Sequence, residues 1–299
     1  MIVSRIIGGL GNQMFQYAAG FAVAEHIRSE HRVDVSAFGR YSLRENSLIH
    51  LNITSASIDD DDYPPIKTSC EGFVEERRGL RTVRESGMRF DPSLFETGDD
   101  LFLFGYWQTE SYFKSVESKI RSEFQVKTEP DAENRNLLAQ IRDSQSVAVH
   151  IRRGDYVSHR KVRKEFGSCT LRYYEGAIRL IKDRVADATF FVFSDEPEWA
   201  QAHLNIERSK YVTHNSGNRD FEDLRLMASC RHFIIANSSF SWWAAWLGAE
   251  ADKTVIAPKP WFLSAKYDSR DVVPRGWMSL PGHAPLALMR ARFKGMLRR

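Results

Sequence analysis

The regular alternation of short apolar runs with amphipathic stretches in the second half of the chain constrains the fold most strongly. Each apolar run has the length of a strand, and the stretches between the runs carry helical spacing or helix-capping residues. This order predicts a parallel α/β sheet, because parallel neighbours require a long crossover connection. The expected strands are residues 147–151, 189–193, 211–213, 233–236 and 254–257.

Helices are expected between these strands. Thr170 is placed to cap one of them and Asp220 another, and Pro197 stands where proline is favoured in a first helical turn. The expected helices are residues 171–185, the segment from Asp220 through Met227 to Cys230, and residues 241–249. The second half therefore has the pattern of a Rossmann-like, nucleotide-binding domain.

The first half opens with the same order of strand, loop and helix and then becomes irregular. The expected elements are a strand at residues 2–7, a loop at 8–13, an Ala-rich helix at 14–27, a second strand around Val33 and Val35, and helices at 112–124 and 132–141.

A chain of 299 residues can hold two domains of about 150 residues each or one large one. Residues 127–130 are the expected linker, which gives domains at residues 1–128 and 129–280 and a basic, amphipathic helix or tail at residues 281–299. Such a tail either docks as a C-terminal helix with a solvated face or lies on an anionic membrane surface.

The segment His150-Ile151-Arg152-Arg153-Gly154-Asp155-Tyr156 directly follows the apolar run of residues 146–149 and begins within the expected strand 147–151. It places an imidazole, two guanidinium groups and a carboxylate at the carboxyl edge of the predicted sheet, where open α/β folds bind ligands. The planar arginine fork suits a diphosphate. The alternative is an Arg–Asp155 ion pair that only fixes the loop.

Two further segments join a strand to a helix. Gly9, Gly11 and Asn12 lie in a Gly-rich loop that lets a phosphate approach the backbone, although Met14 replaces the third glycine of a dinucleotide fingerprint. As an alternative, these glycines serve only the turn. Asn12 and Gln13 add hydrogen-bonding groups that a mere turn would not need.

The segment that contains Ser238, Ser239 and Phe240 can present hydroxyl and backbone N–H groups to a phosphate at a helix N-terminus. In the alternative interpretation, Ser239 only caps the helix. Trp242, Trp243 and Trp246 are expected in the core.

Two carboxylates accompany other strand ends on the same predicted edge. Asp195 directly follows one strand, and Asp223 can accept hydrogen bonds from the N–H edge of a purine such as guanine. Equally, Asp223 can be a helical residue that the dipole favours.

Composition excludes several classes of function. The net charge of +3 is too small to indicate a nucleic-acid partner. Cys70, Cys169 and Cys230 show no disulfide or zinc spacing, and neither HExxH nor GxSxG occurs. The acidic run at residues 59–62 precedes two prolines and is interpreted as a solvated loop. We expect no metal, no signal peptide and no membrane-spanning helix.

Four motifs, taken together and in order, closely resemble those of the GDP-fucose-dependent α-1,2-fucosyltransferases of glycosyltransferase family 11. The resemblance spans about residues 6–262. Animal members usually carry an N-terminal membrane anchor, which this sequence does not show, so a bacterial, cytosolic enzyme is expected, either free or peripheral to the inner membrane. The motifs are GGLGNQMFQY at residues 8–17, HIRRGDY at 150–156, FVFSDE at 191–196 and NSSFSWW at 237–243.

The resemblance implies a GT-B-type fold with two Rossmann-like lobes and an inverting reaction that uses neither metal nor cofactor. It implies that the C-terminal lobe binds the donor GDP-fucose and that the N-terminal lobe binds a glycan acceptor, free or lipid-linked, whose galactosyl 2-hydroxyl receives the fucose. By position, the diphosphate arginine is Arg152, the guanine or ribose contacts are His150 and Asp223, the phosphate contacts are Ser238, Ser239 and the Phe240 backbone, and Asn12 reaches the diphosphate or fucose from the other lobe.

In this mechanism Arg152 stabilises the charge that grows on the departing GDP. Asp155 is the expected base, although it can instead orient an arginine, and His159 or Glu165 in the following loop could replace it. Another GDP-sugar transferase, for instance an α-1,6 enzyme, is the first alternative. A Rossmann oxidoreductase with Asp34 on a ribose, or a non-catalytic binding protein, remains a further alternative.

Overall fold

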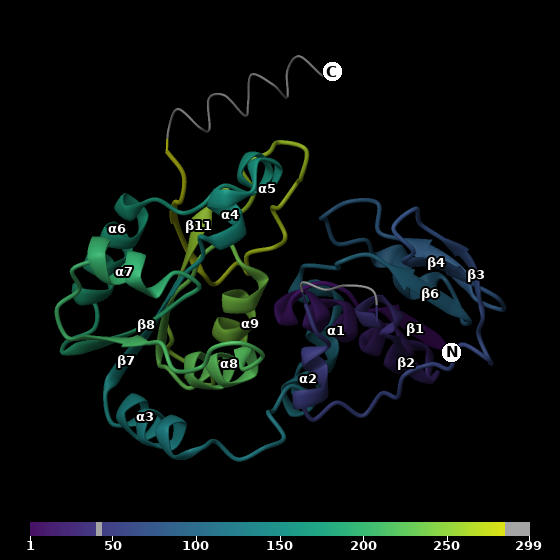
Figure 1. Ribbon diagram of the computed structural model, residues 1–299, viewed down its shortest axis with the longest axis horizontal. Helices are drawn as coiled ribbons and strands as arrows, with labels where there is room; N and C mark the ends of the chain where they lie inside the picture. The colour runs from purple at the N-terminus through teal and green to yellow at the C-terminus, as the bar shows by residue number, and fades with distance from the viewer. Residues whose placement is uncertain (40–43, 285–299) are drawn as a thin grey trace. The chain divides into compact units, whose positions relative to one another are not determined.

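The computed structural model describes residues 1–39 and 44–284 (Figure 1). The chain divides into two compact units, the first from Met1 to Thr128 and the second from Glu129 onward. This division falls within residues 127–130, where a linker was expected. Most of the expected basic tail, residues 285–299, lies outside the described residues.

The first unit is built on a four-stranded parallel sheet in the order β2-β1-β6-β5. An antiparallel pair, β3-β4, stands beside it as a separate small sheet. The strands are β1 (Ile2–Arg5), β2 (His31–Asp34), β3 (Pro65–Thr68), β4 (Val74–Arg77), β5 (Arg81–Arg84) and β6 (Leu101–Phe104). The helices are α1 (Leu10–Ile27), α2 (Glu117–Glu123) and the 3₁₀ segments η1 (Ser36–Gly39), η2 (Ser47–His50), η3 (Pro92–Glu96), η4 (Glu110–Tyr112) and η5 (Lys114–Val116).

Helix α1 forms the crossover between β1 and β2 and is buried over most of its length. Gly20 allows it to pack closely, because a Cβ there would lie 1.9 Å from Ser4 Oγ and 2.7 Å from His31 Nε2. The helix begins at Leu10, four residues before the expected start. The helix expected at residues 112–124 is interrupted, since only Glu117–Glu123 is α-helical.

The second unit contains a six-stranded parallel sheet in the order β12-β11-β10-β7-β8-β9. Its strands are β7 (Gln145–Ile151), β8 (Ala188–Ser194), β9 (Ser209–Val212), β10 (His232–Ile234), β11 (Val255–Lys259) and β12 (Met278–Pro281). Its helices are α3 (Ala132–Arg142), α4 (Gly154–Ser158), α5 (Arg160–Glu165), α6 (Leu171–Lys182), α7 (Pro197–His203), α8 (Asp220–Ala228) and α9 (Ser239–Leu247).

The five strands expected in this half are confirmed within a few residues, and β12 is an addition. Thr170 caps α6 by accepting a hydrogen bond from the Tyr173 N–H, as expected. The expected cap at Asp220 is wrong, because Asp220 is the first residue of α8 and Arg219 precedes it. The tryptophans of α9 are buried as expected, and Trp242 Nε1 donates to the Val272 carbonyl at 2.7 Å.

The parallel register places three strand ends beside one another at one edge of the second sheet. Ile151 at the end of β7 is paired with Ser194 at the end of β8, and Ile234 of β10 is paired with Val149 of β7. The residues that follow β7, β8 and β10 therefore share this carboxyl edge.

Candidate active site

Arg152 is held between two carboxylates at the end of β7. Its Nη2 lies 2.6 Å from Asp155 Oδ1, and its Nη1 lies 3.1 Å from Asp195 Oδ2. Asp195 comes from the adjacent strand end, after β8. The Arg152 side chain is 22% exposed, so it remains accessible to a ligand that can compete with the carboxylates.

The ion pair between Arg152 and Asp155, foreseen as an alternative, is therefore present. It does not exclude ligand binding, because the Arg152 side chain is partly exposed and a diphosphate can compete with the two carboxylates.

Arg153 has a different environment. Its Nε donates to Glu196 Oε2 at 2.9 Å, and its guanidinium lies 3.6 Å from the ring centroid of Trp199. Its backbone N–H donates to Asp195 Oδ1 at 2.9 Å. The two arginine side chains thus have different partners, although the Arg153 backbone shares Asp195 with the Arg152 side chain, and the Arg153 side chain ties β7 to the start of α7.

Gly154 makes room for this arrangement, because a Cβ there would lie 2.7 Å from Asp195 Oδ2. Burial raises the pKa of Asp195, while Arg152 and the Arg153 N–H act in the opposite direction. Removing the Arg152 counter-ion would therefore raise the pKa of Asp195 further.

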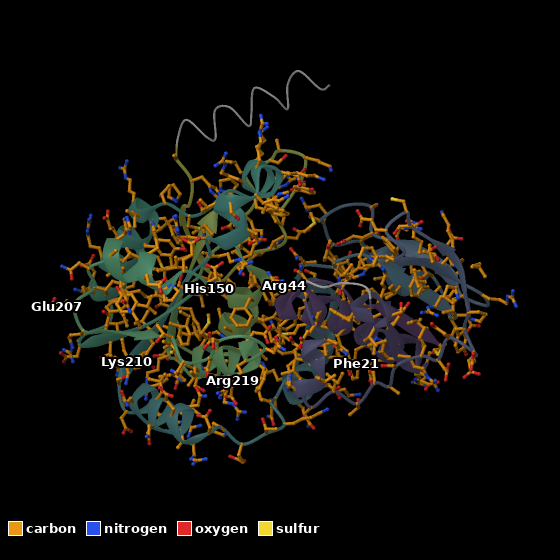
Figure 2. All side chains as sticks on the ribbon, viewed as in Figure 1. Phe21, Arg44, His150, Glu207, Lys210 and Arg219 are labelled. Carbon is orange, nitrogen blue, oxygen red and sulfur yellow. The ribbon has the colours of Figure 1, made fainter. Side chains whose placement is uncertain are left out.

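His150, two residues before Arg152, is a buried, neutral imidazole. It is 6% exposed and lies among the side chains of the second unit, whereas Glu207 lies at the periphery (Figure 2). Burial, and to a lesser degree Arg152, lowers its pKa to about 3. Its Nδ1 has no hydrogen-bond partner among the described residues. Its ring centroid lies 5.7 Å from that of Phe240.

The loop between β10 and α9 is tied to the chain that follows β7 by two side chains, Tyr156 and Asn237. Tyr156 donates from its hydroxyl to the Asn237 carbonyl at 3.1 Å, and Asn237 Nδ2 donates to the Gly167 carbonyl at 2.9 Å. Ser238 is the N-cap residue of α9, and its side chain makes no capping hydrogen bond. The alternative in which Ser239 caps the helix is therefore wrong, because Ser239 is the first residue of α9.

Asp223 belongs to another network, at the end of β9. Its Oδ1 accepts a hydrogen bond from Asn215 Nδ2 at 2.9 Å, and Asn215 exchanges hydrogen bonds with the fully buried Asn134 of α3. His214 Nε2 also lies 2.9 Å from Asn134 Oδ1. Burial raises the pKa of Asp223 to about 7, with smaller effects from its neighbours. The sequence analysis named Asp223 but missed its partners Asn215, Asn134 and His214. The only sign of them in the sequence is that His214 and Asn215 follow a strand.

The three candidate residues of the first unit lie at the start of α1. Gly9 is the N-cap residue, and Gly11 and Asn12 lie in the first turn rather than in a loop. Asn12 Oδ1 accepts from Gln108 Nε2 at 2.8 Å. Gly8 has φ 87°, a conformation that suits glycine.

The sequence analysis expected that a turn would not need the side-chain amides of Asn12 and Gln13, and this expectation is wrong for Gln13. This buried side chain donates to the carbonyls of Gly8 and Glu45, both at 2.7 Å, and accepts from the Ser47 N–H. Gln16 similarly accepts from the Ile7 N–H at 2.8 Å. The two glutamines satisfy backbone groups of the turn, so they are structural residues.

Among the described residues, no three His, Cys, Asp or Glu side chains are grouped as metal ligands. The absence of a metal from the reaction stays a prediction.

The model of glycosyl transferase family 11 matches residues 2–280. The chain belongs to glycosyltransferase family 11. It is 36% identical over 293 residues to an α-1,2-colitosyltransferase of Escherichia coli, covering 94% of this chain and 99% of that protein. It is 26% identical to galactoside α-(1,2)-fucosyltransferase 2 of Bos taurus, covering 81% of this chain and 67% of that protein. The predicted family and the prediction of a glycosyltransferase are confirmed.

The fold is similar to that of the NodZ α-1,6-fucosyltransferase soaked with GDP-fucose, with a TM-score of 0.50 and 14% identity over 82% of this chain and 91% of that one. The predicted GT-B-type α/β fold with parallel sheets is confirmed. Within residues 1–39 and 44–284, every helix is too short or too polar to cross a membrane.

Proposed function

We propose that this family 11 enzyme transfers L-fucose from GDP-fucose to the 2-hydroxyl of a galactosyl acceptor, with inversion and without a metal ion. The observation that carries the proposal is Arg152, fixed by Asp155 and Asp195 at the carboxyl edge of a parallel sheet. A two-armed cation at this edge suits the diphosphate of a nucleotide sugar.

The chemistry follows from charge. When the fucosyl C1–O bond breaks, negative charge grows on the β-phosphate, and Arg152 turns from its carboxylates to stabilise that charge. The first N–H groups of α9, which follow Ser238, add partial positive charge. These groups act where other transferases use a metal ion.

His150, Ser238 and Phe240 complete the proposed donor site. The neutral His150 offers an unpaired Nδ1 to a ribose or guanine group, because its low pKa keeps it uncharged. Asp223 is proposed to accept hydrogen bonds from guanine, although its network is separate from the Arg152 cluster. Gly9, Gly11, Asn12 and Ser239 remain predicted ligand contacts.

Asp155 stays the proposed base that takes the acceptor proton. Its ion pair with Arg152 gives it a second, orienting role. The two roles predict different pH profiles. If Asp155 is the base, kcat/KM of Asp155→Asn no longer falls at acidic pH as that of the wild type does. An unchanged profile with a small loss of rate assigns it the orienting role alone.

A second donor is favoured by one observation, the 36% identity to an α-1,2-colitosyltransferase. Colitose is L-fucose without its 3-hydroxyl, so both sugars fit one diphosphate site. Family membership removes the oxidoreductase alternative. An α-1,6 linkage remains the alternative, and a lipid-linked acceptor and membrane contact stay predictions.

The test is calorimetric binding of GDP, GDP-fucose, UDP and NAD, with EDTA present, to the wild type and to Arg152→Ala. Binding of the GDP compounds alone, weakened in the variant, supports the donor site. Equal binding by the variant contradicts it. Turnover of GDP-fucose and GDP-colitose with a panel of β-galactosides then decides between the two donors.

A further inference from the structure

One hydrogen bond joins the two segments on which the proposed donor site depends. Tyr156 donates from its hydroxyl to the Asn237 carbonyl at 3.1 Å, across 81 positions of the chain. Tyr156 lies in α4, four residues after Arg152, and Asn237 directly precedes Ser238, the N-cap residue of α9. The bond therefore links the segment that carries the guanidinium to the start of the helix whose N–H groups are proposed to stabilise the phosphate charge.

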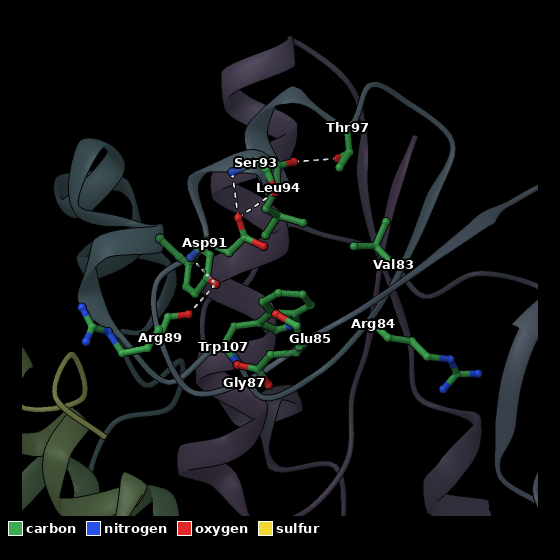
Figure 3. Close-up of a pocket in the computed structure, with 12 residues that line it drawn as sticks. Val83, Arg84, Glu85, Gly87, Arg89, Asp91, Ser93, Leu94, Thr97 and Trp107 are labelled. Atoms are coloured by element: carbon green, nitrogen blue, oxygen red, sulfur yellow. Dashed lines mark hydrogen bonds between the residues drawn. The ribbon is translucent and has the colours of Figure 1, made fainter. Parts of the chain in front are cut away.

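Hydrogen bonds at the small pocket of the first unit are local by comparison (Figure 3). Ser93 donates from its N–H and its hydroxyl to Asp91, and the Thr97 hydroxyl donates to the Leu94 carbonyl at 2.6 Å. These bonds join residues two or three positions apart, so they stabilise the turns around η3. The Tyr156 bond instead joins two segments that come together because β7 and β10 are adjacent in the sheet.

The Tyr156 ring contacts both an aromatic cluster and Arg152. It is stacked on Phe166, with ring centroids 5.6 Å apart and an interplanar angle of 20°, and Phe166 is stacked in turn on Tyr267. The Arg152 guanidinium carbon lies 5.7 Å from the Tyr156 ring centroid, a distance at which the two attract each other. Burial raises the pKa of the Tyr156 hydroxyl, so this group stays a donor at neutral pH. A change in the position of Tyr156 would therefore disturb the guanidinium.

Asn237 is fixed at the other end of the bond. It is buried, its Nδ2 donates to the carbonyls of Phe166 at 3.1 Å and Gly167 at 2.9 Å, and its Oδ1 accepts from Cys169 Sγ at 3.5 Å. The Ser238 side chain makes no capping hydrogen bond. Asn237 thus supplies side-chain contacts that hold the start of α9 in place.

Two elements can contact one diphosphate together only if their spacing matches it. We propose that the Tyr156 hydroxyl is a positioning group, which fixes the spacing between the Arg152 guanidinium and the first N–H groups of α9 so that both meet one diphosphate. This inference rests on the proposed function, because it assumes a diphosphate at this edge. It deepens that function by naming a residue that acts through Arg152. In the alternative interpretation the bond only packs the loop and contributes to stability.

Tyr156→Phe tests the hydroxyl alone, because the variant keeps the ring that stacks on Phe166 and approaches Arg152. Tyr211→Phe is the matched control. The Tyr211 hydroxyl donates to the Leu204 carbonyl at 2.5 Å in the same unit, and neither residue belongs to the proposed donor site. Each variant loses one hydroxyl-to-carbonyl bond, so we expect similar, small decreases in Tm.

The kcat for GDP release and the Kd for GDP are measured for each substitution in the wild-type and the Arg152→Lys backgrounds. In the wild-type background, Tyr156→Phe should lower kcat about tenfold, less than the roughly 10²-fold that a misplacement of 1 Å can cost, and should weaken GDP binding. Tyr211→Phe should keep both values within about twofold. In the Arg152→Lys background the loss from Tyr156→Phe should be smaller, because the group that it positions is gone.

Three results overturn the proposal. One is a Tyr156→Phe variant whose kcat and Kd stay within about twofold of wild type. Another is an equal loss of kcat in Tyr211→Phe. The last is an equal loss from Tyr156→Phe in both backgrounds, which a role in stability alone predicts.

A signal that needs no ligand separates this proposal from the proposed function. The Arg152 Nε–H resonance is assigned in ¹⁵N NMR spectra by its loss in Arg152→Lys, and we expect Tyr156→Phe, but not Tyr211→Phe, to shift it and to speed its exchange with water. If the wild type binds neither GDP nor GDP-fucose but Tyr156→Phe changes the resonance, the donor assignment fails and the positioning of Arg152 stands. If the wild type binds GDP and Tyr156→Phe leaves the resonance, kcat and Kd unchanged, the positioning role fails and the donor assignment stands.

Discussion

Replacing Arg152 by lysine keeps the positive charge and removes the fork that reaches two carboxylates. One ammonium cannot take the place of Nη1, 3.1 Å from Asp195, and of Nη2, 2.6 Å from Asp155, at the same time. If the proposed mechanism is correct, the variant still attracts the diphosphate but no longer places two donors on the departing oxygen atoms.

The expected losses of activity and stability differ in size. Removing one preorganised donor from a transition state costs about 10²–10³ in kcat, or roughly 3–4 kcal/mol. The ion pairs themselves are partly exposed, with Arg152 22% and Asp155 46% exposed, so breaking one costs about 0.2–1 kcal/mol of stability. That lowers Tm by no more than about 4 °C.

The assay follows GDP release at saturating donor and acceptor, with thermal unfolding measured on the same samples. Arg153→Lys is the matched control, because its partners Glu196 and Trp199 give it a structural role. We expect this control to lose stability and to keep kcat within about threefold. A kcat for Arg152→Lys within about threefold of wild type would refute the reasoning from the bidentate fork.

Three further predictions concern stability and reactivity. Gly20→Ala should lower the free energy of unfolding by about 1–3 kcal/mol, because the added Cβ would overlap Ser4 Oγ. A Tm equal to that of wild type contradicts this prediction. Burial raises the pKa of Asp223 to about 7, so folding favours its protonated form and the stability it contributes falls as pH rises from about 4 to 7. In urea titrations, the free energy of unfolding of Asp223→Asn should not fall in this way and should exceed that of wild type by at most about 4 kcal/mol at pH 8. Parallel pH dependences of the two free energies would contradict this prediction. Cys70 is exposed and the other two cysteines are buried, so a thiol reagent should titrate one group in the native protein and none in Cys70→Ser; fast reaction of a second thiol would count against the buried positions.

The second unit was more predictable from sequence than the first. Its strands are continuous apolar runs, because a central parallel strand is buried on both faces, as in β7 and β8. In the first unit, β5 carries arginine at both ends and β3 is fully exposed, so neither has an apolar pattern that reveals it. Strand β12 was missed for the same reason, because its residues alternate between partly buried and exposed positions and form no apolar run.

The candidate site was predictable where one segment supplies its residues. Arg152 and Asp155 lie in one motif, and their pairing was foreseen as an alternative. The contact of Arg152 with Asp195 depends on the register of β7 against β8, which the sequence does not specify. Gln13 was misread because its partner Glu45 is 32 residues away.

The structure places Arg152 between Asp155 and Asp195, so two carboxylates already balance its charge. A diphosphate that binds this guanidinium therefore displaces anions instead of meeting a bare cation, and the released carboxylates need new partners. Burial raises the pKa of Asp195, and losing the Arg152 counter-ion raises it further and favours proton uptake by this carboxylate. If a nucleotide binds at this edge as proposed, its binding is an anion exchange linked to proton uptake, and its measured enthalpy varies with the ionisation heat of the buffer.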